Sequence, residues 1–170
     1  GNLASGTATG WNHRIASSIG TLADSGVVMV SGLFQGLGLP TSTSIPLVNR
    51  SGAAVWTTAA SSRARVLAGA PSVRVTVTPS QREVSLFAYL YSVNALGVGE
   101  LLSYKPVTLS GTAGRAQTLE IEMEAGAAEI PAGRKLALVI DTKDPRYADR
   151  TSGLGTVSFS SPAASPSLLR

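Results

Sequence analysis

Residues 72–93 read SVRVTVTPSQREVSLFAYLYSV, and this stretch decides the fold. In its first part, Val73, Val75 and Val77 alternate with polar residues, which is the period-2 pattern of a half-buried strand. The sequence Pro-Ser-Gln-Arg then predicts a tight turn. We therefore expect a hairpin here, with the remaining strands arranged around it.

The second part of the stretch, residues 83–93, is apolar on both faces. Val84 and Leu86 begin one apolar face, and Phe87 and Tyr89 begin the other. A strand that needs cover on both faces belongs in the middle of a sheet rather than at its edge.

Short strands with Gly- and Pro-rich turns continue along the chain. Residues 118–124 alternate between apolar residues and glutamates, residues 134–141 have a continuously apolar centre, and residues 156–160 alternate again. About eight or nine such strands with little helix predict an all-β fold, a sandwich or jelly roll.

The expected domain organisation has three parts. Residues 1–26 form an N-terminal extension or linker with a short helix capped by Asn12, residues 27–160 form the β-sandwich, and residues 161–170 form a flexible tail. Residues 27–35 are expected to be the first strand of the sandwich.

Composition limits the function classes. The 170 residues fit one domain, and the absence of cysteine excludes disulfides, thiolate catalysis and cysteine metal sites. The net charge of +4 comes mostly from scattered arginines, which predicts no nucleic-acid partner. No apolar run approaches the roughly 18–20 residues of a membrane span. The lysine-poor composition favours an extracytoplasmic setting.

No complete catalytic site is visible. No serine lies in a G-x-S-x-G motif, and the one histidine, His13, lies in a Gly-rich segment unsuited to a fixed triad. We therefore predict no catalytic residue in this chain.

Two ligand sites are conceivable. Asp141, Asp144 and Asp149 follow an apolar strand and are candidate Ca²⁺ ligands, although ion pairing with neighbouring basic residues is favoured over a metal site. Trp56, Tyr104 and Tyr147 are candidates for stacking on sugar rings, with a place in the core favoured for Trp56. No other cofactor is indicated.

Four segments, taken in order, resemble one known family. They are Val55-Trp56-Thr57-Thr58, the LAGAPSVRV of residues 67–75, the LFAYLYSV of residues 86–93 followed by Gly97 and Gly99, and the IPAGRKLALVI of residues 130–140. This order is similar to the C-terminal non-catalytic domain of X-prolyl dipeptidyl peptidases and of cocaine-esterase-type (CocE/NonD) hydrolases. Ser92 stands where the family commonly has an aspartate, and Arg134 stands where it has a histidine.

The resemblance implies a galactose-binding-like jelly roll. It also implies an accessory domain that packs on the α/β-hydrolase catalytic domain of the same polypeptide, shapes its substrate cleft and supports a homo-oligomer. The parent would be a dipeptidyl peptidase or an acyl-ester serine hydrolase. The alternative is an independent carbohydrate-binding jelly-roll module.

Overall fold

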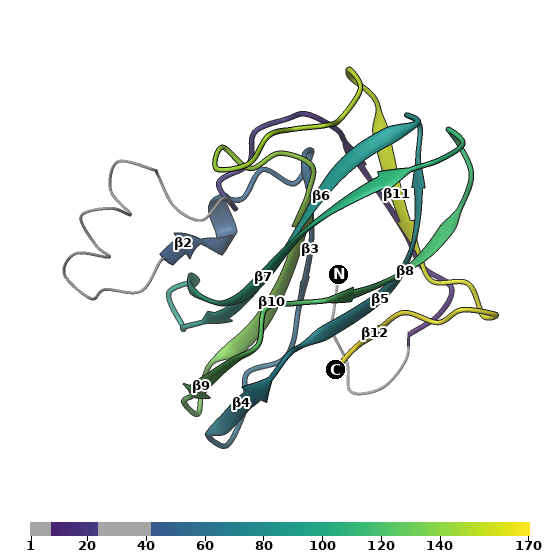
Figure 1. Ribbon diagram of the computed structural model, residues 1–170. Coiled ribbons are helices and arrows are strands. Elements are labelled where there is room, and N and C mark those ends of the chain that lie inside the picture. The colour runs from purple at the N-terminus through teal and green to yellow at the C-terminus, as the bar shows by residue number, and fades with distance from the viewer. Residues whose placement is uncertain (1–7, 24–41) are drawn as a thin grey trace.

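The computed structural model describes residues 8–23 and 42–170, and almost all of the regular secondary structure in them is strand (Figure 1). In chain order the elements are β1 (Asn12–Ala16), β2 (Ser42–Ser44), the 3₁₀ helix η1 (Ile45–Leu47), β3 (Ala53–Thr57), β4 (Arg65–Gly69), β5 (Ser72–Pro79), β6 (Glu83–Val93), β7 (Val98–Ser110), β8 (Gln117–Glu122), β9 (Gly126–Ile130), β10 (Lys135–Asp141), β11 (Thr156–Ser160) and β12 (Leu168–Leu169). Within this part of the chain, no helix is long and apolar enough to cross a membrane.

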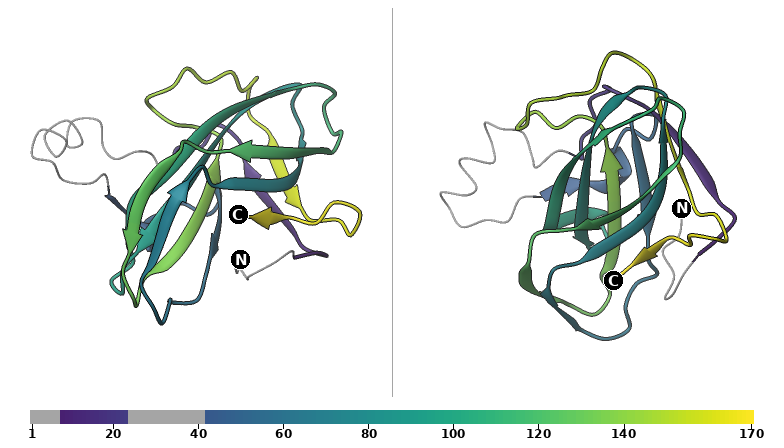
Figure 2. Two further views of the ribbon diagram at one scale, coloured as in Figure 1. Left: turned by 60° about the horizontal axis from the view of Figure 1, so that its bottom comes forward. Right: turned by 45° about the vertical axis from the view of Figure 1, so that its right-hand side comes forward.

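Two antiparallel sheets form a sandwich (Figure 2). The β6 sheet has the order β2-β7-β6-β10-β3. In the β5 sheet, β8 pairs with one edge of β5, while β11 and β12 share the other edge and β1 pairs with β11. The strands β4 and β9 form a separate two-stranded ribbon.

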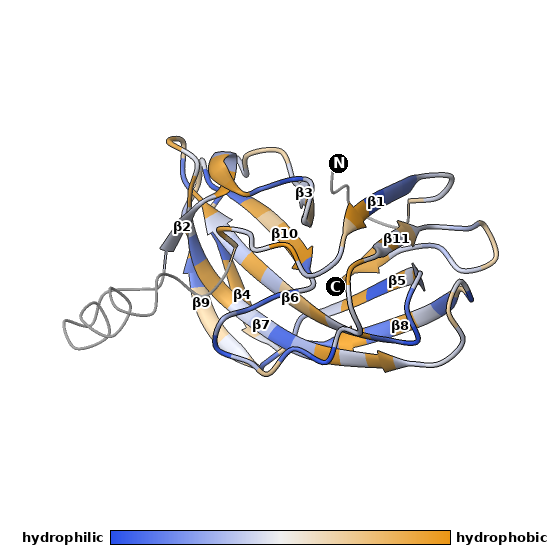
Figure 3. Cartoon of the chain, turned by 90° about the horizontal axis from the view of Figure 1, so that it is seen from above, coloured by the Kyte–Doolittle hydropathy of each residue, from blue (hydrophilic) through white to orange (hydrophobic). Residues whose placement is uncertain are grey.

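The β6 strand lies at the centre of its sheet, between β7 and β10, as its sequence predicts. Its alternate residues enter two different cores. Leu86 and Leu90 join the cluster between the two sheets, which also contains Val75 and Phe159. Tyr89 joins a second cluster on the outer face of the β6 sheet. The outer cluster is closed by side chains from η1 and the loops beside it. The β10 strand is apolar along most of its length (Figure 3) and contributes side chains to both clusters.

The predicted hairpin is wrong in its pairing. The β5 and β6 strands do not pair with each other, because the turn between them carries the chain from one sheet to the other. Gln81 holds this turn from inside the fold, since its side-chain amide donates hydrogen bonds to the Ser17 hydroxyl and to the carbonyl of Gly153 (3.3 Å). The apolar face of β5 therefore packs across the sandwich on β6 instead of lying beside it.

Both ends of the chain differ from the sequence-based expectation. The helix predicted from Asn12 is wrong, because Asn12–Ala16 is a strand in which Ile15 lies opposite Val157. Near the other end, residues 168–169 return to the β5 sheet, where Leu168 lies opposite Arg74. The strand expected at residues 27–35 lies outside the described residues.

The inner core provides a test of these packing assignments. Leu86→Ala should lower the free energy of unfolding by about 2–5 kcal/mol, because it leaves a cavity between the sheets at a side chain that is 1% exposed. Chemical denaturation measures this change. The matched control is Leu96→Ala in the turn after β6, where the leucine is 85% exposed and we expect a change within about 0.5 kcal/mol. Equal losses in the two variants would contradict the assigned core.

Candidate functional site

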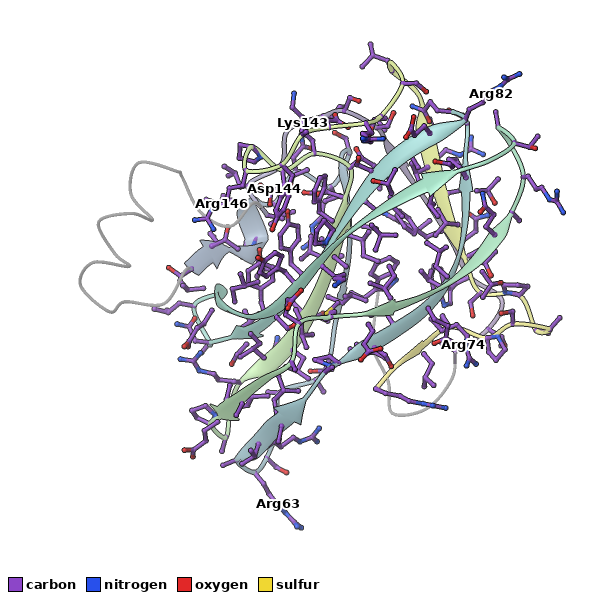
Figure 4. The ribbon with its side chains drawn as sticks, in the orientation of Figure 1. Arg63, Arg74, Arg82, Lys143, Asp144 and Arg146 are labelled. Atoms are coloured by element: carbon purple, nitrogen blue, oxygen red, sulfur yellow. The ribbon has the colours of Figure 1, made fainter. Side chains whose placement is uncertain are left out.

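Two buried carboxylates lie at the end of β10 and in the loop that follows it, which joins the two sheets. Asp141 ends β10 and is fully buried, and Asp144 is 2% exposed. Tyr89 on β6 donates its hydroxyl hydrogen to Asp144 Oδ2 at 2.5 Å, and the backbone N–H of Arg146 donates to Asp144 Oδ1 at 2.7 Å. The hydroxyl of Thr21 donates to Asp141 Oδ2 at 2.5 Å. These bonds fasten the loop to the outer face of the β6 sheet, and Figure 4 shows Lys143, Asp144 and Arg146 together at this end.

The electrostatics of this cluster fix the protonation of Tyr89. Burial raises the pKa of the Tyr89 phenol far above its ordinary value of 10, and the negative charge of Asp141 and the hydrogen bond to Asp144 raise it further. The raised pKa favours the protonated phenol, which donates its hydrogen bond to a buried carboxylate, and this arrangement stabilises a loop. Tyr89 is not among the site residues expected from the sequence. The available signal was a tyrosine hydroxyl in an otherwise apolar strand, because a buried hydroxyl needs an acceptor.

The three aspartates that are candidate Ca²⁺ ligands are not brought together in one site. Asp149 is exposed, and its Oδ1 accepts a hydrogen bond from the backbone N–H of Thr151 at 2.7 Å in a local turn. Asp141 and Asp144, in contrast, both lie near Tyr89 and raise its pKa. Across residues 8–23 and 42–170, no group of three or more His, Cys, Asp or Glu side chains is arranged to hold a metal ion.

The predicted aromatic ligand site is divided between the two faces of the β6 sheet. On the outer side, the Tyr147 ring lies 5.5 Å from the Phe87 ring and 6.4 Å from the Tyr104 ring, centroid to centroid. The hydrogen bond with Tyr104 and partial burial raise the pKa of Tyr147 to about 12. Trp56 faces the opposite side, where it is 7% exposed and its ring lies 5.5 Å from that of Trp11.

His13 is in a setting unlike that of a triad histidine. It lies in β1 opposite Phe159, with its ring 6.3 Å from the Trp56 ring. Burial lowers the pKa of His13, and the nearby Arg50 guanidinium lowers it further. No carboxylate in the described part of the chain is among the groups that shift it. A catalytic histidine has the opposite surroundings, because a carboxylate stabilises its charged form.

Comparison with known proteins places these features in a family. The family model of the X-Pro dipeptidyl-peptidase C-terminal non-catalytic domain matches residues 12–164 of the sequence. No curated protein matches the sequence. An alpha-amino acid ester hydrolase structure is similar with a TM-score of 0.74 and 13% identity, over 98% of this chain and 33% of that one.

Two further structures have the same fold. A CocE/NonD family hydrolase from Staphylococcus aureus gives a TM-score of 0.65 and 10% identity, over 99% of this chain and 34% of that one. An aminopeptidase from a marine sediment Thaumarchaeota archaeon gives a TM-score of 0.64 and 13% identity, over 71% of this chain and 25% of that one. The chain thus spans a quarter to a third of the length of these structures.

The Tyr89–Asp144 bond should contribute measurably to stability. Tyr89→Phe leaves a buried carboxylate oxygen without its donor, so we expect the free energy of unfolding to fall by about 1–3 kcal/mol in urea denaturation. Tyr147→Phe is the control. Its side chain is 36% exposed, so water replaces the lost partner and the change should stay within about 0.5 kcal/mol. A larger loss in the control than in Tyr89→Phe would contradict the assigned roles.

The same tyrosine predicts a pH dependence. The pKa of Tyr89 is raised in the folded state, so its contribution to stability is complete below about pH 10 and is lost as the pH rises above that value. In that range the unfolding free energy of the wild type should fall, through this residue, by about 1.4 kcal/mol per pH unit relative to Tyr89→Phe. Denaturation series at several pH values on both proteins measure the difference. A difference that is constant with pH would show that Tyr89 ionises normally in the fold.

Proposed function

The chain belongs to the family of X-Pro dipeptidyl-peptidase C-terminal non-catalytic domains, and from this membership we propose that it is the accessory domain of a larger serine hydrolase. In this role it packs on an α/β-hydrolase catalytic domain of the same polypeptide and shapes the substrate cleft. One observation carries the proposal. The family match extends over nearly the whole sandwich, while the chain spans at most about a third of the similar hydrolase structures.

We propose that the strand topology of the sandwich is that of a galactose-binding-like jelly roll. Strand pairing supports it, because β6 pairs with β7, β5 with β8, β4 with β9 and β3 with β10, all antiparallel. These nested pairs describe one long hairpin whose tip is the β6–β7 turn. Folding such a hairpin over itself produces the two sheets of a jelly roll.

The surface that we assign to the catalytic domain lies at the tip of this hairpin. The β6–β7 turn packs against η1, where the backbone N–H of Ile45 donates to the carbonyl of Gly97 at 3.0 Å. Seven large hydrophobic side chains are exposed in the described residues. Four of them lie around this end: Leu22, Leu47, Leu96 and Val98. An apolar surface of this kind is typical of a docking site on another domain.

The reaction class is tested by comparing two lengths of polypeptide. We expect cleavage of an alanyl-prolyl chromogenic amide, or of a simple aryl ester, by the longest polypeptide that the gene encodes and none by the 170-residue chain. The substrate that is cleaved assigns the parent to the peptidases or to the esterases. Activity of the short chain, or inactivity of both proteins on both substrates, would contradict the proposal.

A pair of leucines tests the assigned surface in the same long polypeptide. Leu96→Glu should lower activity several-fold and expose the junction to limited proteolysis, because a carboxylate would be buried against an apolar partner. Leu154→Glu is the matched control, since Leu154 is 84% exposed compared with 85% for Leu96 and lies in the loop before β11. Equal behaviour of the two variants would place the interface elsewhere.

A further inference from the structure

A large groove opens between the two sheets on the side opposite the outer cluster. Its cavity volume is about 670 Å³, within the range of small-molecule sites. The β10 strand supplies Leu136, Leu138 and Ile140 to its floor, and β5 supplies Val73 and Val75 from the other sheet. The floor therefore consists of the ends of core side chains and offers hydrocarbon rather than hydrogen-bonding groups.

The charged side chains that line this groove are all positive. Its lining contains four arginines, Arg65, Arg74, Arg134 and Arg170, and no aspartate or glutamate. Two of these arginines have carboxylate partners outside the lining: Arg74 pairs with Glu120, and Arg134 Nη1 lies 3.0 Å from Glu100 Oε2. The side chain of Arg65 forms no ion pair with any residue in the described part of the chain.

We propose that the groove binds an aliphatic carboxylate, with the hydrocarbon tail on the floor and the carboxylate at the rim beside Arg65. An apolar floor gains from burying alkyl groups at roughly 25 cal/mol per Å². The planar guanidinium fork matches the two oxygens of a carboxylate. Two of the four arginines, Arg74 and Arg134, are already paired, so the groove needs fewer anionic groups from a ligand than its four arginines suggest. The hydroxyl side chains of the lining, Thr58, Ser61, Ser62 and Ser167, belong to loops and not to β5 or β10, so the hydroxyls of a sugar would find no side-chain partner on the floor itself.

The chain carries its own reporter for this site. It has two tryptophans, Trp11 and Trp56, and both line the groove. Their rings are 5.5 Å apart, so a ligand that enters beside them changes the environment of both. Intrinsic tryptophan fluorescence therefore responds to the groove and to no other tryptophan site in the molecule.

The test is a fluorescence titration of the 170-residue chain with three ligands of one tail length: decanoate, decanol and decyltrimethylammonium. We expect saturable binding of decanoate below its micellar concentration, roughly ten-fold tighter than decanol, because the carboxylate gains a charge-assisted hydrogen bond. The ammonium ligand should bind more weakly than decanol, since the rim arginines repel it. No saturable change with decanoate, or equal affinity for all three ligands, overturns the proposal.

Variants of two arginines in the same segment distinguish a specific contact between the ligand and Arg65 from a general attraction by the positive net charge. Arg65→Gln should weaken decanoate binding roughly ten-fold and leave decanol binding unchanged. Arg63→Gln is the matched control and should change neither, because Arg63 is exposed two residues away, does not line the groove and points outward in Figure 4. Equal weakening by both variants would reduce the effect to net charge and overturn the assigned site. The titration needs no hydrolase domain, so its result is independent of the accessory role proposed above.

Discussion

The burial of β6 on both faces is the constraint on which the rest of the structure depends. A strand that is apolar on both sides has to be covered twice, so one sandwich core is not enough. The β5 sheet covers one face, and η1 with its neighbouring loops covers the other. The outer cluster therefore gives the short segments around Ile45 and Val48 a packing role, because both side chains are buried against the outer face of this sheet.

Much of the strand pattern could be predicted from the sequence, because periodicity reports burial directly. The alternation in β5 and β8 and the apolar run of β10 all correspond to the observed faces. Pairing could not be predicted in the same way. Two strands joined by a short turn have the same local pattern whether they pair or cross between sheets, and the crossing here is held by Gln81, whose partners Ser17 and Gly153 are far away in sequence. At the N-terminus, the spacing of Ile15 and Ile19 suited a helix, but pairing with β11 determines the structure.

The loop after β10 shows a similar limit for site prediction. Three aspartates in nine residues are consistent with a cation site when only the sequence is considered. In the fold, Asp141 and Asp144 are buried beside hydroxyl donors, while Asp149 caps its own turn at the surface. A buried carboxylate needs either hydrogen-bond donors or a metal ion to offset its lost hydration. Here the hydroxyls of a tyrosine and a threonine are the donors. The hydroxyl partners come from β6 and from a segment 120 residues earlier in the chain, so no local motif could identify them.

The same sheet separates the groove from the outer cluster, to which η1 beside the assigned docking surface contributes. Leu138 and Leu90 face the groove side, and the residues next to them, Val139 and Tyr91, face the outer cluster. Leu90 and Leu138 also lie directly opposite each other across the β6–β10 pair. The lining of the groove and the outer cluster therefore both contain side chains from these same two strands. A strand that is buried on both faces therefore ties the groove side and the outer side of this domain to one and the same sheet.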